Sequence, residues 1–181
     1  ASSEYKKLGL EYIEINLSVS QCMHHGLADS ILESMSRYGV SSNQVNIEIT
    51  ESAASYDQSV MSENLERLSA AGLTFSLDDY GTGYSNMYRI AALPLKIVKL
   101  DKTFVNNQNS KMWTILQNTV RMIKDLNMEI VVEGIETEEM VKKFSDLKCD
   151  FIQGYFFSKP IPQREFVEFI DRWNNRQKVN A

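Results

Sequence analysis

Short apolar segments that alternate with helical segments recur six times along the chain, and this order limits the fold more than any other feature. The predicted strands cover residues 12–19, 45–50, 73–79, 95–101, 128–135 and 149–156. The predicted helices cover residues 20–38, 56–71, 85–92, 110–126, 137–147 and 162–173, with the terminal RQKVNA as a frayed tail. Strands and helices in strict alternation form right-handed βαβ units around a parallel sheet. We therefore expect an α/β protein with a single domain over residues 1–181.

The first three predicted strands each have one apolar face and one polar face. In the first, Ile13, Ile15 and Leu17 share a face, because alternate side chains of a strand point to opposite sides. A doubly covered parallel sheet would be apolar on both faces. A barrel with helices outside and polar groups inside its mouth fits better, and a complete barrel of this kind has roughly 250 residues. The chain therefore predicts a parallel (β/α) TIM-type barrel that is incomplete, with about six of eight βα units.

The charge balance excludes some classes of partner. The chain carries a net charge of −5, whereas a protein that binds polymeric nucleic acid needs clustered Lys and Arg. No apolar stretch is long enough to span a bilayer, so we expect no direct membrane contact, although other domains of a parent protein could anchor it. Cys22 and Cys149 are far apart and outside any CxxC pattern, which favours reduced thiols in a cytoplasmic protein.

Polar side chains gather near the carboxyl end of every predicted strand. They are Asn16, Glu48, Asp78, Asp79, Lys99, Asp101, Glu133 and Gln153. In parallel β/α folds this end of the sheet carries the active site. Carboxylates that converge there would repel one another unless cations lie between them, and Mg²⁺ or Mn²⁺ prefers such oxygen ligands. A pair of these ions is the usual arrangement for in-line phosphodiester hydrolysis.

These residues, and the nearby Glu51, also have simpler structural explanations. A single acid or amide at a strand end often caps the next helix. Lys99 could pair with Asp79 or Asp101. Glu51 could favour a helix N-terminus, and Gln153 could satisfy buried backbone groups. These explanations suffice for any one position, but their repetition on six consecutive strands favours a shared site.

Six motifs follow one another in the chain. They are NLS (16–18), EITE (48–51), DDYGTGYSN (78–86), KLDK (99–102), EGIET (133–137) and QGYFFSKP (153–160). Together they resemble the EAL-domain phosphodiesterases, which hydrolyse the bacterial messenger cyclic di-GMP, and the resemblance covers almost the whole chain. Tyr80 in place of the commoner Phe, and Ile135 in place of Val, are mild departures from that family.

The resemblance implies a two-metal site. Asn16, Glu48 and Asp78 match the ligands of one ion, and Asp78 with Asp79 match the residues that serve a second. The cofactors implied for the intact domain are therefore two Mg²⁺ or Mn²⁺ ions. The substrate implied is cyclic di-GMP, cleaved to the linear dinucleotide pGpG.

The remaining motif residues match groups around the metals. Lys99 and Glu133 match residues that position or activate the attacking water. Positions that match the substrate pocket are Asp101, Gln153 and Pro160. Positions that match a loop anchor and its loop, which in the family couple dimer contacts to the metal site, are Glu51, Gly81 and Gly83.

The Glu-Ala-Leu motif that names the family has no counterpart in the chain. It supplies a metal ligand from a strand about two βα units before Asn16. Glu4, Glu11 and Glu14 lack the Ala-Leu context and the right distance, so none is assigned this role. We therefore expect a domain fragment without its first strands. Its open sheet edges predict a homodimer that covers them, and the parent protein is expected to carry sensory or GGDEF-type domains.

Three functions remain for the chain. The first is metal-dependent hydrolysis of cyclic di-GMP, which the intact motifs from Asn16 to Gln153 favour. The second is a catalytically inactive module that binds cyclic di-GMP or another protein, which the missing glutamate favours. The third is an unrelated metal-dependent barrel such as an enolase-like lyase, and the DDYGTGYSN, EGIET and QGYFFSKP segments argue against it.

Overall fold

The computed structural model describes residues 8–54, 59–82, 87–106 and 109–179. Its centre is one six-stranded sheet in the order β1-β2-β3-β4-β5-β6, with every neighbouring pair parallel. The strands are β1 (Ile13–Leu17), β2 (Val45–Thr50), β3 (Thr74–Tyr80), β4 (Ile97–Leu100), β5 (Glu129–Val132) and β6 (Phe151–Ile152). The prediction of an α/β fold with a parallel sheet is confirmed, and β2 has the predicted bounds.

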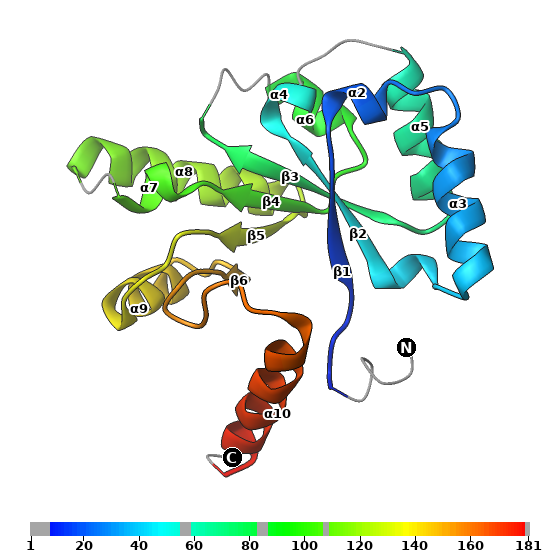
Figure 1. The fold of residues 1–181 in the computed structure, drawn as a ribbon. Coiled ribbons are helices and arrows are strands. Elements are labelled where there is room, and N and C mark those ends of the chain that lie inside the picture. The colour runs from blue at the N-terminus through cyan, green and yellow to red at the C-terminus, as the bar shows by residue number, and fades with distance from the viewer. Residues whose placement is uncertain (1–7, 55–58, 83–86, 107–108, 180–181) are drawn as a thin grey trace.

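Helices follow the strands and cover the sheet (Figure 1). They are α2 (Val19–Cys22), α3 (Leu27–Tyr38), α4 (Glu51–Ala54), α5 (Ser59–Ala70), α6 (Met87–Ala92), α7 (Lys102–Asn106), α8 (Ser110–Asp125), α9 (Glu138–Asp146) and α10 (Gln163–Val179), with a 3₁₀ turn at Ser42–Gln44. Within the described residues, no strand pairs with the outer edge of β1 or of β6. The barrel is therefore not closed, and α10 lies on the open side (Figure 1).

The helix predicted over residues 20–38 is wrong, because the structure breaks it in two. Ser18 caps the N-terminus of α2 in a reciprocal pair of hydrogen bonds with Gln21, and α2 ends at Cys22. The buried Asn64 side chain then donates hydrogen bonds to the carbonyl oxygens of Cys22, at 3.0 Å, and His24, at 2.9 Å. These carbonyls would otherwise accept bonds within a continuous helix, so a residue 40 positions away stabilises the break.

The predictions for the C-terminal part of the chain need two corrections. The last strand is β6, with only two residues instead of the predicted 149–156. Gly154 follows it closely, at a position where a Cβ would lie 2.0 Å from the backbone oxygen of Ile135. The predicted frayed tail is also wrong for residues 176–179, since α10 continues to Val179, and residues 180 and 181 lie outside the described residues. The short helices α4 and α7 were not predicted.

One hydrophobic core lies between the apolar face of the sheet and the helices. It includes Ile47, Ile49, Phe75 and Leu77 from the central strands. The helices contribute the side chains Leu65, Leu68, Leu116, Val120 and Ile123. The opposite face of the same strands is polar and also buried, with Asn46, Glu48, Ser76 and Lys99. The candidate site lies on this buried polar face.

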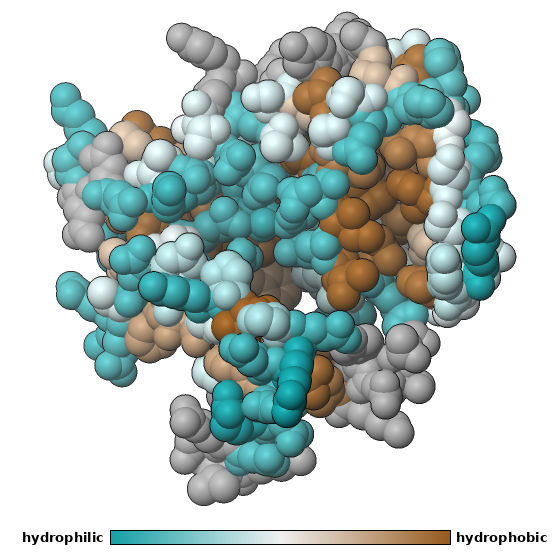
Figure 2. Space-filling model, in the orientation of Figure 1, coloured by the Kyte–Doolittle hydropathy of each residue, from teal (hydrophilic) through white to brown (hydrophobic). Residues whose placement is uncertain are grey.

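β1 departs from this arrangement at the open edge. Ile13 and Ile15 share the apolar face of the strand, but they are 57% and 44% exposed. Figure 2 shows hydrophobic surface beside β1 and a hydrophilic band over the ends of β3 and β4. The predicted covering of this face by helices therefore holds for Leu17 but not for the start of the strand. None of the described helices is long and apolar enough to cross a membrane.

Candidate functional site

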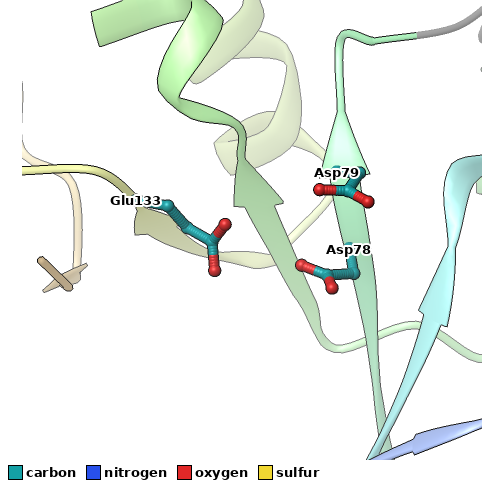
Figure 3. A group of neighbouring side chains, drawn as sticks. All are labelled: Asp78, Asp79 and Glu133. Atoms are coloured by element: carbon teal, nitrogen blue, oxygen red, sulfur yellow. The ribbon is translucent and has the colours of Figure 1, made fainter. Parts of the chain in front are cut away.

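A distortion at the end of β3 brings two consecutive aspartates to the same place. Successive side chains of a regular strand point to opposite faces. Here the register with β4 shifts between Leu77 and Tyr80, and Asp79 has a left-handed φ of 57°. This conformation is unfavourable by about 1 kcal/mol for a residue other than glycine, although Asp tolerates it better than most. Because of it, Asp78 and Asp79 both direct their carboxylates toward Glu133 at the end of β5 (Figure 3).

Asp78, Asp79 and Glu133 form a compact group of carboxylates. One oxygen from each lies within 4.8 Å of the others. Such spacing fits a hard divalent cation, which takes oxygen ligands at about 2.0–2.6 Å. The sequence predicted all three residues as site residues, and the structure brings them together from two strands that are not neighbours in the sheet.

Lys99 on β4 lies in the middle of the site. Its Nζ donates a hydrogen bond to Glu48 and lies 2.9 Å from Glu133 and 3.2 Å from Asp78. Lys99 and Glu48 are almost completely buried, at 4% and 5% exposed. Burial by itself lowers the pKa of Lys99, but its hydrogen bonds to Glu48 and Glu133 outweigh this effect, so the net shift in pKa is upward. The group is therefore held as an ammonium ion.

Negative charge exceeds positive charge in this cluster. One ammonium meets the carboxylates of Glu48, Asp78 and Glu133, and Asp79 adds a fourth. Burial raises the pKa of Glu133, against the lowering effect of Lys99. Burial followed by the charge of Asp78 raises the pKa of Asp79. The carboxylates therefore have unused capacity for a cation.

One buried oxygen gives a direct test of this fit. Asp78 Oδ1 is shielded from solvent and accepts no hydrogen bond of good geometry within the described structure, although Lys99 Nζ lies 3.2 Å away. The Lys99 ammonium is its ion-pair partner, but Glu48 and Glu133 share that ammonium, so the charge of the buried oxygen is only partly compensated. A divalent cation would satisfy it, so the residues present fit the predicted Mg²⁺ or Mn²⁺.

The structure gives the other predicted metal ligand, Asn16, a less enclosed position. Asn16 on β1 is in register with Glu48 on β2, so the two side chains share the polar face of the sheet. Asn16 is exposed, because β1 is an edge strand. Its register places it beside the cluster, on the side where the barrel is open.

The predicted substrate-binding residues fall in two places. Asp101 is buried at the end of β4, and its Oδ1 accepts a hydrogen bond from the Thr103 backbone N–H at 2.8 Å, which gives it a structural role at the start of α7. Gln153 and Pro160 are exposed and line an open cavity of about 820 Å³ between β1, β6 and α10. The same cavity is lined by Glu14, so it reaches the polar face of β1.

Glu51 connects the end of β2 to the loop that follows β3. The residue is 3% exposed, and its Oε2 accepts a hydrogen bond from the Gly81 backbone N–H at 2.8 Å. Gly81 has a φ of 102°, and a Cβ there would lie 2.0 Å from the ring of Phe104. Glycine is therefore required on both conformational and steric grounds. Gly83, the other predicted loop glycine, lies outside the described residues.

A second polar layer beneath the carboxylates was missed in the sequence. The hydroxyl of Ser76 donates a hydrogen bond of 2.7 Å to Asn46 Oδ1, and both residues are fully buried. Each lies two positions before a predicted site residue on the same strand, Glu48 and Asp78. The sequence contained a signal for this layer, because residues two positions apart on a strand share a face.

Comparison with known proteins identifies the family. The family model for the EAL domain matches residues 3–160. The chain belongs to the EAL domain family. The carboxylates, the lysine and the Glu51–Gly81 contact described above all fall within the matched region.

Curated relatives of this EAL domain are much longer proteins. It is 35% identical over 160 residues to the bifunctional diguanylate cyclase/cyclic di-GMP phosphodiesterase MucR of Pseudomonas aeruginosa, covering 87% of this chain and 23% of MucR. It is 30% identical to the cyclic di-GMP phosphodiesterase RocR of the same organism, covering 87% of this chain and 41% of RocR. The oxygen sensor protein DosP of Escherichia coli is 32% identical, with 84% of this chain and 19% of DosP covered.

Solved structures agree with this assignment. A MucR phosphodiesterase in complex with c-di-GMP superposes with a TM-score of 0.80 at 35% identity, over 86% of this chain and 64% of that one. The EAL domain of Mycobacterium smegmatis DcpA superposes with a TM-score of 0.84 at 28% identity, over 94% and 78%. Klebsiella pneumoniae BlrP1, solved with manganese and cy-diGMP, gives 0.77 at 27% identity, over 87% and 41%.

Proposed function

We propose that this EAL domain is a metal-dependent phosphodiesterase that hydrolyses cyclic di-GMP to linear pGpG. The observation that carries the proposal is the cluster around Lys99, in which one buried ammonium faces more carboxylates than it can neutralise. The curated relatives MucR and RocR are named as cyclic di-GMP phosphodiesterases. The excess of carboxylates supplies what a phosphodiester substrate needs, because cations held there offset the negative charge of the phosphate.

The proposal gives each residue of the cluster a role. Asn16, Glu48, Asp78 and Asp79 would hold Mg²⁺ or Mn²⁺, which when bound activate water and neutralise charge on the phosphate. The Glu133 carboxylate, with its raised pKa, can take a proton from the attacking water. Lys99 fixes the Glu133 carboxylate by their 2.9 Å contact and places a positive charge beside the reacting phosphate.

The proposed path for the substrate runs along the open cavity. Gln153 and Pro160 line it and offer one polar and one apolar contact to a guanine or ribose. Asp101 would act from the end of β4, two residues after Lys99. Glu51 and the glycine loop would transmit changes at that loop to β3, through the hydrogen bond to Gly81.

A second candidate function is a regulatory module that binds cyclic di-GMP or another protein without catalysis. The observation that favours it is the open edge at β1, where Asn16 is exposed and apolar side chains of the same strand face solvent. A less enclosed metal ligand would weaken metal binding. The pocket could then bind the dinucleotide without cleaving it.

The proposal extends to partners. We propose a homodimer in which a second copy covers the exposed edges of β1 and β6, because unpaired strand edges readily pair with other strands. The parent protein would also carry sensory or GGDEF-type domains, since MucR and DosP are several times longer than the matched region. Two unpaired cysteines, Cys22 and Cys149, support a reducing compartment such as the cytoplasm.

Hydrolysis of cyclic di-GMP with Mn²⁺, with Mg²⁺ and with EDTA tests the proposed function. We expect pGpG to form with either metal and not with EDTA. Asp78→Asn should abolish it, while Asp150→Asn, which changes a carboxylate outside the cluster, should retain it. Binding of cyclic di-GMP without hydrolysis would support the regulatory module. The absence of both binding and hydrolysis would contradict the assignment to this nucleotide.

A further inference from the structure

Glu14 on β1 is a carboxylate on the polar face of the sheet that no motif assigns to the site. It is in register with Asn46 on β2, two positions before the pair Asn16 and Glu48. Side chains in register on neighbouring parallel strands lie on the same face. Glu14 therefore lies at the boundary between the carboxylate cluster and the open cavity, whose lining includes it.

The charged groups of the cluster affect the protonation of the Glu14 carboxyl group. Glu14 is exposed at the open edge of the sheet, but partial desolvation beside the cluster, followed by the charge of Glu48 and a hydrogen bond between the two carboxyl groups, raises its pKa to about 7. The charge of Lys99 lowers this pKa in opposition, but the ion pairs of Lys99 are with Glu48, Asp78 and Glu133. Among the described residues, no Lys or Arg forms an ion pair with Glu14. The cluster thus contains a further carboxyl group without a cation of its own.

A buried donor independently points to the same position. Asn46 is fully buried, and its Oδ1 accepts the hydrogen bond from Ser76, which fixes the orientation of the amide. The Nδ2 atom at the other end of that amide has no hydrogen-bond partner within the described structure. A buried N–H group without an acceptor is unfavourable by about 1–3 kcal/mol. The residue in register with Asn46 on the neighbouring strand is Glu14, so a carboxylate oxygen drawn inward there would satisfy the donor.

We propose that Glu14 is an additional carboxylate ligand of the divalent-cation site, with Asn46 as the residue that positions it. This inference rests on the proposed function, because it assumes a cation at the cluster. Mg²⁺ and Mn²⁺ take about six oxygen ligands, and the described carboxylates on β2, β3 and β5 supply only part of such a set. Glu14 would supply oxygen from β1, with one carboxylate oxygen toward the cation and the other toward Asn46 Nδ2.

A purely structural role for Glu14 predicts something different. In that case Glu14 would share a proton with Glu48 and have no effect on metal affinity. Metal affinity in a chain with a neutral residue at position 14 separates the two roles. The matched control is Glu11, an exposed acid that precedes β1 and changes the net charge by the same amount.

The experiment is a titration of the wild-type chain, Glu14→Gln and Glu11→Gln with Mn²⁺. Binding is measured by calorimetry and by the electron paramagnetic resonance signal of free Mn²⁺. We expect Glu14→Gln to weaken Mn²⁺ binding on the order of tenfold, the effect typical for loss of a group that supports a metal site. Glu11→Gln should bind as the wild type does. Equal affinity of Glu14→Gln and wild type would overturn the inference and leave the proposed function intact, whereas failure of the wild type to bind Mn²⁺ would overturn both.

Thermal unfolding with and without Mn²⁺ provides a second readout. In EDTA, Glu14→Gln should unfold at or above the wild-type temperature, because the substitution removes a repelled carboxylate. The increase in melting temperature caused by Mn²⁺ should be smaller than in the wild type. If Glu14→Gln fails to fold by circular dichroism, Glu14→Asp replaces it: a ligand shortened by one methylene should lose affinity, and unchanged affinity would contradict the inference.

Discussion

Two lysines of this EAL domain form ion pairs with carboxylates on other elements of the fold. They differ in burial and in the number of carboxylates that each one faces. Lys124 on α8 pairs with one carboxylate, Asp150, which also accepts a hydrogen bond of 2.7 Å from the Ile130 backbone N–H. Lys99 is almost fully buried and faces three carboxylates at once. The side chains of Lys124 and Asp150 remain 34% and 29% exposed.

The difference is one of charge balance. The Lys124 pair is neutral and its acceptors are satisfied, so it fastens α8 and β5 to the segment before β6 and does nothing more. The Lys99 cluster keeps an excess of negative charge, and its buried Asp78 oxygen has only the shared Lys99 ammonium, at 3.2 Å, as a partner. A buried group of charges that does not balance is unfavourable by itself. Under the proposed function a bound cation would offset this excess charge, whereas the Lys124 pair needs no such ion.

The largest expected effect comes from removing each lysine in turn. Lys99→Met should lower the free energy of unfolding of the metal-free chain by about 3–5 kcal/mol, because the buried Glu48 is left without a positive charge beside it. Lys124→Met should lower it by about 1 kcal/mol, as for a partly exposed pair. Urea unfolding in EDTA measures both. Mn²⁺ should restore part of the stability lost in Lys99→Met, and equal losses in the two variants would contradict the comparison.

Removal of one carboxylate from the Lys99 cluster and one from the Lys124 pair should change the melting temperature in opposite directions. Burial raises the pKa of Glu133, so its charged form is disfavoured in the folded state. Glu133→Gln should therefore raise the melting temperature in EDTA by about 2–4 °C, the change expected for 1 kcal/mol in a chain of this size. Asp150→Asn should lower it by a similar amount, because the ion pair with Lys124 is lost. A decrease in both variants, measured by calorimetry, would show that the cluster is balanced without metal.

The smallest effect is a pH dependence carried by Glu14. Its pKa rises from 4.5 when unperturbed to about 7 in the folded chain. A raised pKa means that the folded state binds the proton more tightly, so this contribution to stability is complete below about pH 4.5 and is lost as the pH rises through about 7. Relative to the wild type in EDTA, Glu14→Gln should therefore gain stability between about pH 5 and pH 8. A difference in melting temperature that does not change with pH would contradict this assignment.

Much of the sheet could be predicted because strand parity and strand–helix alternation are local signals. β2 has its predicted bounds, and the residues Asp78, Lys99 and Glu133 were predicted at strand ends and lie together in the structure. The break after Cys22 could not be predicted, since it depends on Asn64, which belongs to α5. Nor could the close approach of Gly154 to the backbone of Ile135, just after the two-residue β6, be predicted from local sequence.

The sequence by itself determined the order of the strands, the polar face of the sheet and the residues at the carboxyl ends of the strands, because each follows from periodicities of two and of 3.6 residues. Only the tertiary structure decided which of these groups meet. The left-handed backbone of Asp79 turns two consecutive aspartates to one side, and the register of β1 and β2 brings Glu14 beside Asn46. Both depend on the pairing of strands that are separate in the sequence. Only that pairing sets the distances between these side chains, their burial and the balance of their charges.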